Sequence, residues 1–378
     1  MTRIATTITE RLGIALPIIQ APMAGGGDTP ALVSAVCEAG GIGFIGVAYS
    51  EPAQVIEAAR AVRSRTNRPF GINVFAPVAA PAAPPQVSRA LERLARYYEA
   101  LGIAPPPPPA PRADGIDRQI EAVLQTDAAA FSFTFGPIPD SAMHAVKQRF
   151  FVIGTATTVG EAVELERRGV DAVIAQGAEA GGHRGTFAVP FEHGMVGTMA
   201  LVPQVASSVG VPVIASGGIM DGRGIAAALA LGASAVQMGT AFLACHESGI
   251  PAAYRDALTS ATEARTAITR AFSGRPARGI ANRFMEEMRD AGDDILPFPL
   301  QNALTRPLRD AAARQGRAEF LSLWAGQGVG LARSMRAADL VARLAAETGA
   351  VLESLGRIAL HHEGADTGNT GKNTRGAL

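Results

Sequence analysis

The chain has 378 residues, of which 48% are hydrophobic and 18% charged. This length suffices for one large α/β domain with insertions or for two domains. The 34 basic residues balance the 34 acidic residues, so no basic field favours nucleic acid or an acidic membrane. No stretch approaches the roughly 18 uninterrupted apolar residues of a membrane helix, and the N-terminus lacks an apolar signal-like segment. The composition therefore favours a cytoplasmic enzyme that acts on small molecules.

Short runs rich in Ile, Val and Phe alternate along the chain with Ala-rich segments of helical period. We expect eight strands, at 17–21, 43–46, 70–74, 129–134, 150–154, 172–176, 212–216 and 235–238. We expect the helices between them at 30–39, 52–65, 116–124, 140–148, 159–168, 199–209 and 222–231. This alternation predicts a (β/α)8 TIM barrel rather than an open sheet.

Two segments are too long for ordinary connections between a strand and a helix. The first, 76–115, is rich in proline around an amphipathic helix predicted at 87–101, and we expect an excursion over the barrel mouth. The second, 246–315, is polar and of helical character. The expected organisation is a barrel formed by 1–75 and 116–245, a smaller and mainly helical second lobe from the two long segments, helices at 316–360 that return to the barrel, including one at 334–347, and a frayed tail at 361–378.

Loops of small residues follow the sixth, seventh and eighth predicted strands. The first carries Gly181 and His183, the second Gly217 and Gly218, and the third Gly239 with Thr240. Such loops lie together at the C-terminal face of a barrel, where backbone N–H groups bind phosphate, and the positive end of a following helix adds to this. A single Gly-Gly pair is more often only a tight turn than a phosphate site. Two such loops after consecutive strands favour a phosphate site.

Neutral polar groups end two predicted strands near the opposite end of the chain, in its first part. The first strand runs into Pro22 and Met23, and the third reaches Asn73. Backbone groups and amides suit a heteroaromatic ring with donors and acceptors, so ring and phosphate would belong to one cofactor. When each is considered alone, Asn73 is more often a turn or cap residue, and Met23 is more often a core residue.

His183 is the candidate catalytic residue. With an ordinary pKa near 6.5 it would be largely neutral and able to act as a general base, although a surface histidine is the alternative. The adjacent Arg184 is either a partner for an anionic substrate or an exposed side chain, and Glu179 either orients a neighbour or is solvated. Cys37 and Cys245 lack metal-ligand spacing and are expected to be buried thiols, and no metal site is expected.

These motifs jointly resemble the nitronate monooxygenases, formerly called 2-nitropropane dioxygenases. The matching segments are 17–23, 71–74, 176–185, 216–219 and 237–240. The resemblance implies FMN bound non-covalently in the barrel. The residues that would hold it are Pro22, Met23, Asn73, Gln176, Gly181, Gly217, Gly218, Gln237, Gly239 and Thr240.

The resemblance also implies a reaction. A nitronate gives an electron to the flavin, O2 is reduced, and the product breaks down to a carbonyl compound and nitrite. His183 would face the substrate, as an orienting group or as the base that first deprotonates a neutral nitroalkane. The chain would be a monomer or a homodimer.

Two other functions stay open. The FMN-dependent enoyl-acyl carrier protein reductases are similar in the same loops, so an NAD(P)H-dependent reductase of enoyl thioesters or quinones is one alternative. The other is a phosphate-binding barrel without flavin. The proline-rich segment 76–115 matches no motif of the family, which leaves the natural substrate undefined.

Overall fold

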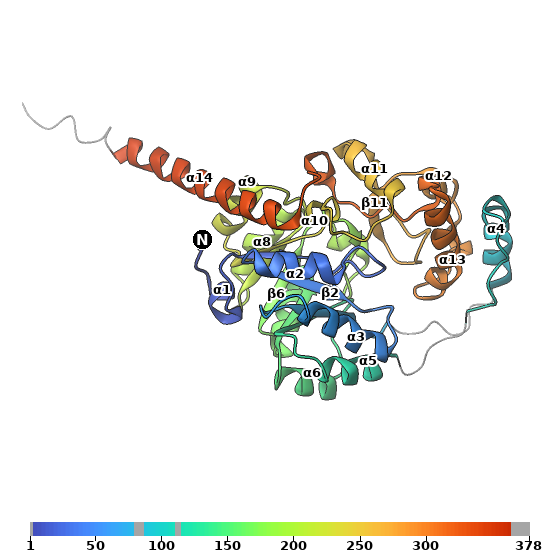
Figure 1. Ribbon diagram of the computed structural model, residues 1–378, viewed down its shortest axis with the longest axis horizontal. Coiled ribbons are helices and arrows are strands. Elements are labelled where there is room, and N and C mark those ends of the chain that lie inside the picture. The colour runs from blue at the N-terminus through green and yellow to red at the C-terminus, as the bar shows by residue number, and fades with distance from the viewer. Residues whose placement is uncertain (1–2, 79–86, 110–114, 364–378) are drawn as a thin grey trace, which may run out of the picture.

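The computed structural model describes residues 3–78, 87–109 and 115–363. Eight parallel strands form a closed barrel in the order β1-β2-β3-β4-β5-β6-β8-β9, and pairing of Ile18 with Val236 joins the last strand to the first (Figure 1). Their bounds are β1 Ile18–Gln20, β2 Ile42–Gly46, β3 Gly71–Phe75, β4 Ala130–Thr134, β5 Phe151–Ala156, β6 Ala172–Gln176, β8 Val213–Ser216 and β9 Ala235–Met238. The predicted TIM barrel and all eight predicted strands are confirmed.

Helices surround the barrel at the predicted places. They are α2 Pro30–Glu38, α3 Pro52–Arg63, α5 Gly115–Leu124, α6 Asp140–Lys147, α7 Val159–Arg167, α8 Thr198–Ala206 and α9 Gly222–Ala230. Local capping explains several starts: Thr29 and Thr158 accept backbone N–H groups at the first turns of α2 and α7, and Pro30 occupies the first helical position. The apolar faces of these helices and the outer faces of the strands form the largest hydrophobic core.

The inside of the barrel is closed at one end only. An additional short helix, α1 (Thr7–Leu12), places Ile8 and Leu12 against strand-start residues such as Ile42 and Ala235. Its ends are defined by a capping box at Thr6 and by Gly13 with φ +66°. Because α1 fills the N-terminal end of the barrel, ligands have access from the opposite end, where the strands stop.

A second lobe with its own core lies beside that open end (Figure 1). Its elements are α4 Val87–Ala100, α10 Thr240–Leu243, α11 Ala252–Ser260, α12 Arg283–Glu287, α13 Leu300–Gln315, the strands β7 Gly182–His183, β10 Thr266–Thr269 and β11 Ala277–Ile280, and the short helices η2 Glu263–Arg265, η3 Gly292–Asp294, η4 Ala318–Phe320 and η5 Gln327–Leu331. A further short helix, η1 Phe191–Gly194, lies between β7 and α8. The lobe is mainly helical, as predicted, but the sequence did not predict its antiparallel sheet β10-β11-β7.

The helix predicted at 87–101 is confirmed as α4. Tyr97 and Tyr98 are buried in the core of the lobe, and the Tyr98 hydroxyl donates to the carbonyl of Leu304 in α13 at 2.9 Å. No residue of α4 lines the pocket described below, so this helix supports the lobe from outside. The proline-rich stretches next to it lie partly outside the described residues.

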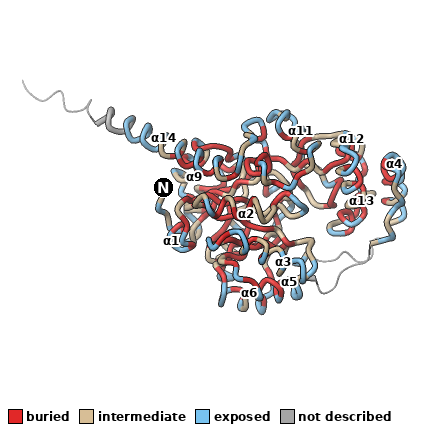
Figure 2. The backbone as a smooth tube through the Cα atoms, viewed as in Figure 1, coloured by how far each residue is buried: buried red, intermediate tan, exposed pale blue. Residues whose placement is uncertain are grey.

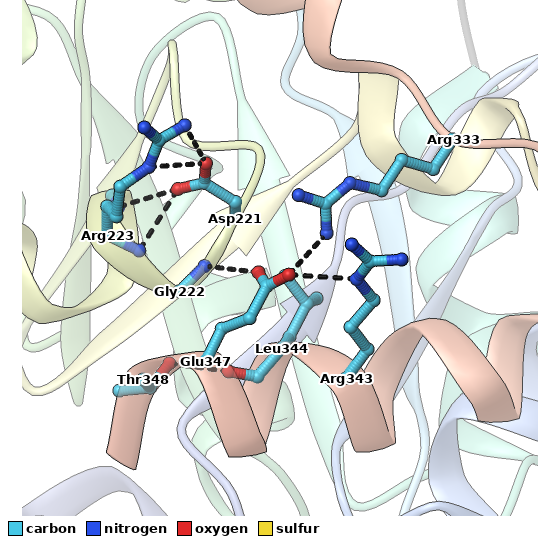
Figure 3. Close-up of polar contacts among 9 residues, drawn as sticks. Asp221, Gly222, Arg223, Arg333, Arg343, Leu344, Glu347 and Thr348 are labelled. Carbon is cyan, nitrogen blue, oxygen red and sulfur yellow. Dashed lines mark hydrogen bonds and ion pairs between the residues drawn. The ribbon is translucent and has the colours of Figure 1, made fainter. Parts of the chain in front are cut away.

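The last helix, α14 (Ala337–Glu363), is longer than the predicted 334–347 and also includes the first residues of the predicted tail. Its first half packs on α9 and α2. Glu347 ties it there by accepting from the Gly222 N–H at 3.1 Å, from Arg333 at 2.7 Å and from Arg343 at 2.8 Å (Figure 3). Beyond Thr348 the helix extends away from the barrel, and residues 349–357 are exposed or half-buried (Figure 2). Within the described parts of the chain, no helix is both long and apolar enough to span a membrane.

Candidate active site

A pocket of ≈ 300 Å³ lies at the open end of the barrel, between the strand ends and the second lobe. Every residue that the sequence singled out for the site lines it: Pro22, Met23, Asn73, Gln176, Gly181, His183, Gly217, Gly218, Gln237, Gly239 and Thr240. Residues from five strands or the loops after them are thereby brought together, because parallel strands all end at one rim. The role of each residue stays a prediction, whereas their shared location is an observation.

Two glycines leave bare backbone on the pocket wall. A Cβ at Gly239 would approach only Ala21, at 3.7 Å, and a Cβ at Gly218 only the Glu179 side chain, at 3.4 Å. Among the hydrogen bonds of the described residues, none has the N–H of Gly217, Gly218 or Gly239 as its donor. Unpaired N–H groups beside open space form a cradle for an anion.

The other two glycines of the site have a packing reason. A Cβ at Gly181 would lie 2.5 Å from the backbone nitrogen of Gly326, and a Cβ at Gly217 would lie 3.0 Å from that of Ala180. Gly181 thus lets its loop approach the lobe backbone, and Gly217 lets the loops after β6 and β8 approach each other. Glycine is therefore required there by the protein itself, whatever the pocket binds.

Helix dipoles contribute less to the cradle than the sequence predicts. The helix after Gly218, α9, starts only at Gly222, and the Asp221 carboxylate already accepts from the N–H groups of Arg223 and Gly224. The helix after Gly239, α10, has four residues. The first helix is therefore already capped by a carboxylate and the second is very short, so the structure gives less support to a helix N-terminus than to the free peptide N–H groups of the glycine loops.

Hydrogen bonds between the barrel and the lobe place His183. It forms β7 with Gly182 and pairs with Ala277 of β11, in the lobe. On the barrel side, the Gln176 amide donates to the His183 carbonyl at 3.1 Å and accepts from the Gly185 N–H at 2.9 Å. Gln176 thus holds the histidine loop, in addition to lining the pocket.

Aromatic rings surround the imidazole. Phe75, Phe135, Phe298 and Trp324 have ring centroids 5.6 to 6.1 Å from that of His183. Burial among them, with the positive charges of Arg275 and Arg309 nearby, lowers the pKa of His183 to about 3. The prediction of an ordinary pKa near 6.5 is therefore wrong, because the sequence does not show the rings and cations that disfavour imidazolium.

Arg184 has neither of the two roles considered for it. Its side chain is 1% exposed and donates to the carbonyls of Gly177 at 2.6 Å, Gln176 at 3.0 Å and Gly194 at 2.9 Å. It is therefore a structural residue that satisfies three carbonyls behind the histidine loop. Glu179 orients a neighbour, as one interpretation expected, by accepting from the N–H and hydroxyl of Thr198 at 2.9 Å.

Asn73 lies within β3, is 4% exposed and donates to the Ser132 hydroxyl at 2.9 Å. It is therefore not the turn or cap residue of the alternative interpretation. Cys37 and Cys245 are free and buried, as expected.

The sequence missed the pocket wall that the lobe supplies. Trp324, Arg306, Arg309 and Tyr254 line it, together with Tyr49 from the barrel. Trp324 is the one tryptophan of the chain, which was an available signal. The arginines belong to the ordinary-looking amphipathic helix α13, so only the fold reveals that they face the site.

The backbone conformation of Phe135 is a further feature of the site that the sequence does not reveal. Its backbone has φ +83°, the one positive value among the non-glycine residues that the structure describes. Such a conformation costs free energy and is concentrated at functional sites. The Arg275 guanidinium lies over the Phe135 ring at 3.9 Å, and this contact helps to hold the ring beside His183.

A buried carboxylate holds the loop after β1. One oxygen of Asp28, which is 8% exposed, accepts from the N–H of Met23 at 2.5 Å and from the N–H of Gly46 at 2.7 Å. Met23 lines the pocket and Gly46 ends β2. Burial raises the pKa of Asp28 to about 7, although these N–H groups oppose the rise.

This carboxylate predicts a pH effect on stability. Because the pKa in the folded protein is raised above the ordinary 3.8, the folded state binds more protons between pH 4 and 7, and its stability falls as pH rises through that window. We expect the unfolding free energy of wild type, relative to Asp28→Asn, to drop by roughly 2–3 kcal/mol between pH 5 and pH 8. Urea unfolding of both proteins at the two pH values measures it. An identical pH dependence in the two proteins would show that Asp28 does not titrate there.

Comparisons with known proteins agree with this geometry. The family model described as nitronate monooxygenase matches residues 6–347. A probable nitronate monooxygenase of Staphylococcus aureus (strain MSSA476) is 42% identical over 339 residues, which cover 89% of this chain and 95% of the relative. The chain belongs to the nitronate monooxygenase family. It is thus an oxidoreductase, and the matched region ends at Glu347, next to the point where α14 extends away from the barrel.

Solved structures of similar fold include two with substantial sequence identity. Nitroalkane oxidase from Streptomyces ansochromogenes superposes with a TM-score of 0.86 at 42% identity, covering 92% of this chain and 99% of that one. FabK from Thermotoga maritima has a TM-score of 0.74 at 31% identity, covering 94% and 99%. Each alignment covers more than nine-tenths of this chain and therefore extends over both barrel and lobe.

Proposed function

We propose that this chain oxidises alkyl nitronates with bound FMN and O2, yielding a carbonyl compound and nitrite, and that His183 orients the substrate or deprotonates a neutral nitroalkane. The observation that carries the proposal is the placement of the bare glycine cradle and the buried imidazole in one pocket. Membership of the nitronate monooxygenase family supports the substrate class. FMN, O2 and the histidine role are the proposed part.

The residues of the pocket fit FMN. The unpaired N–H groups of Gly217, Gly218 and Gly239 suit a phosphate, the Gln237 amide offers a donor and an acceptor to a ring edge, and the backbone carbonyls at Pro22 and Met23 offer acceptors. When bound, FMN would supply the redox chemistry by accepting electrons from the substrate and delivering them to O2. The protein supplies placement, charge and exclusion of water.

The charges around His183 favour an anionic substrate. Arg309 lines the pocket, and among the described residues it forms no ion pair. Its guanidinium donates instead to Asn302, at 2.7 Å from the side-chain oxygen. Half-buried cations that disfavour imidazolium favour a bound anion, and a nitronate carries its negative charge on the nitro oxygens. The structure therefore fits a substrate that arrives already deprotonated.

The low pKa of His183 defines what the imidazole does. At neutral pH the ring is uncharged, so it offers one donor and one acceptor to the substrate. With a neutral nitroalkane, the free ring nitrogen would take the proton α to the nitro group, and the developing nitronate would stabilise the imidazolium beside it. Phe135, Phe298 and Trp324 keep water away from this exchange.

One set of measurements tests the proposal. The purified chain is incubated with an alkyl nitronate and, separately, with the parent nitroalkane under air, while nitrite release and oxygen uptake are followed. The released cofactor is identified by mass spectrometry, and NADH oxidation is followed in parallel with enoyl thioester and quinone acceptors. We expect nitrite and FMN. NADH consumption with an acceptor and no nitrite would instead establish the reductase, and absence of flavin would establish the phosphate-binding barrel.

A further inference from the structure

Ser273 is the hydrogen-bond partner of the His183 ring. Its hydroxyl oxygen lies 2.8 Å from Nε2 of the imidazole, and no other group of the described residues hydrogen-bonds to the ring. Ser273 is 1% exposed and comes from the lobe, 90 residues later in the chain. Among the described residues the second ring nitrogen, Nδ1, has no hydrogen-bond partner, and His183 lines the pocket.

The turn that carries Ser273 is rigid. A Cβ at Gly274, where φ is +83°, would lie 2.1 Å from the carbonyl oxygen of Leu296, so the turn is pressed against that chain segment. The Arg184 N–H donates to the Pro276 carbonyl at 2.8 Å, and Arg275 donates back to the Arg184 carbonyl at 3.2 Å. The distance between the hydroxyl and the imidazole is therefore fixed from both sides.

The hydrogen-bond partners of the Ser273 hydroxyl determine where its proton points. The oxygen accepts from the Arg275 N–H at 3.2 Å, and the hydroxyl donates to the Arg275 carbonyl at 3.1 Å. Among the described residues that carbonyl has no other donor. If the hydroxyl donated to the imidazole instead, the Arg275 carbonyl would lose its one hydrogen-bond donor among the described residues, which costs free energy in this half-buried turn.

A hydroxyl has one proton and two acceptor sites. With its proton on the Arg275 carbonyl, one acceptor site takes the Arg275 N–H and the other is open to Nε2–H. All groups are then satisfied only if the imidazole donates. We infer that Ser273 holds His183 in the tautomer with the proton on Nε2, so that Nδ1 presents its lone pair to the reacting group.

Ser273 is thus a positioning residue that acts through His183. The tautomer follows from hydrogen bonds within the protein, whereas the use of Nδ1 as a base rests on the proposed function. A proton taken from the substrate carbon would bind Nδ1, while Nε2–H keeps its bond to Ser273. The wrong tautomer would point N–H at the substrate and offer no lone pair.

The test reads the tautomer directly in the full-length protein with its cofactor. Histidine is labelled with nitrogen-15, long-range proton–nitrogen spectra are recorded near pH 7, and the His183 signals are identified by their loss in His183→Gln. We expect a protonated Nε2 and an unprotonated Nδ1 in wild type and in Ser273→Thr. We expect averaging of the two tautomers in Ser273→Ala, with circular dichroism and cofactor content unchanged.

The kinetic counterpart separates this inference from the proposed function. Ser273→Ala is expected to lower turnover of a neutral nitroalkane by about 10- to 100-fold, more than turnover of the matching nitronate, and Ser273→Thr to restore it. A proton on Nδ1 in wild type, or averaged tautomers there, would overturn the inference even if nitrite is formed. Conversely, the expected spectra without nitrite would overturn the proposed function alone.

Discussion

Replacing His183 with alanine is expected to lower kcat/KM for neutral nitroalkanes by about 10²- to 10⁴-fold, the range of a lost general base. Bound FMN is expected to stay, because the glycine cradle lies on other loops. Turnover of preformed nitronates is expected to fall much less, since no proton has to be removed. Steady-state rates with both substrate forms, together with the flavin-to-protein ratio, measure these effects.

A matched control is His193→Ala, because His193 is exposed on η1 and does not line the pocket. It should leave both rates unchanged. The pH profile adds a second criterion: with the pKa of His183 at about 3, the imidazole stays neutral, and kcat/KM for a nitroalkane should not decrease as pH is lowered from 8 to 6. Equal losses with nitronate and nitroalkane would assign His183 to orientation of the substrate, and no loss would remove it from the reaction.

Gly239→Val is expected to weaken FMN binding by about 10-fold or more, which corresponds to ~1.4 kcal/mol. Gly239 has φ −101°, so valine fits the backbone without strain, and its Cβ would meet only Ala21. The rest of the side chain must then occupy the space in front of the unpaired N–H groups. The dissociation constant of FMN, from quenching of flavin fluorescence, measures the effect.

Gly239 is a better position for this test than Gly218. The backbone of Gly218 has φ +73°, so any side chain there would also strain the loop and obscure the reason for a loss. Gly160→Val in α7 is the matched control, because a Cβ there meets nothing within 4 Å and the residue is exposed. An unchanged dissociation constant in Gly239→Val would place the phosphate elsewhere.

The barrel could be predicted from the sequence because its signals are local. Runs such as Ala172–Gln176 combine β-branched residues with small-residue loops, and each is separated from the next by a helix of clear period. Shared positions at the strand ends then follow from the barrel itself, which is why the predicted residues line one pocket.

The lobe could not be predicted in the same way. Its strands β10 and β11 have four residues each, and β7 has two, too few for a periodic pattern. Ser273 and Arg309 contact or face the site only through long-range packing, which no local spacing encodes. The low pKa of His183 is likewise a property of the assembled surroundings rather than of the glycine-rich segment that carries it.

The pairing of His183 with Ala277 has a mechanical consequence. By chain order His183 belongs to the loop after the barrel strand β6, yet its backbone pairs with a strand of the lobe sheet. If ligand entry moves that sheet away from the barrel rim, the imidazole moves with it, and return of the sheet restores the position of the ring. Entry of a ligand and alignment of His183 would then be coupled through the two residue pairs that join β7 to β11.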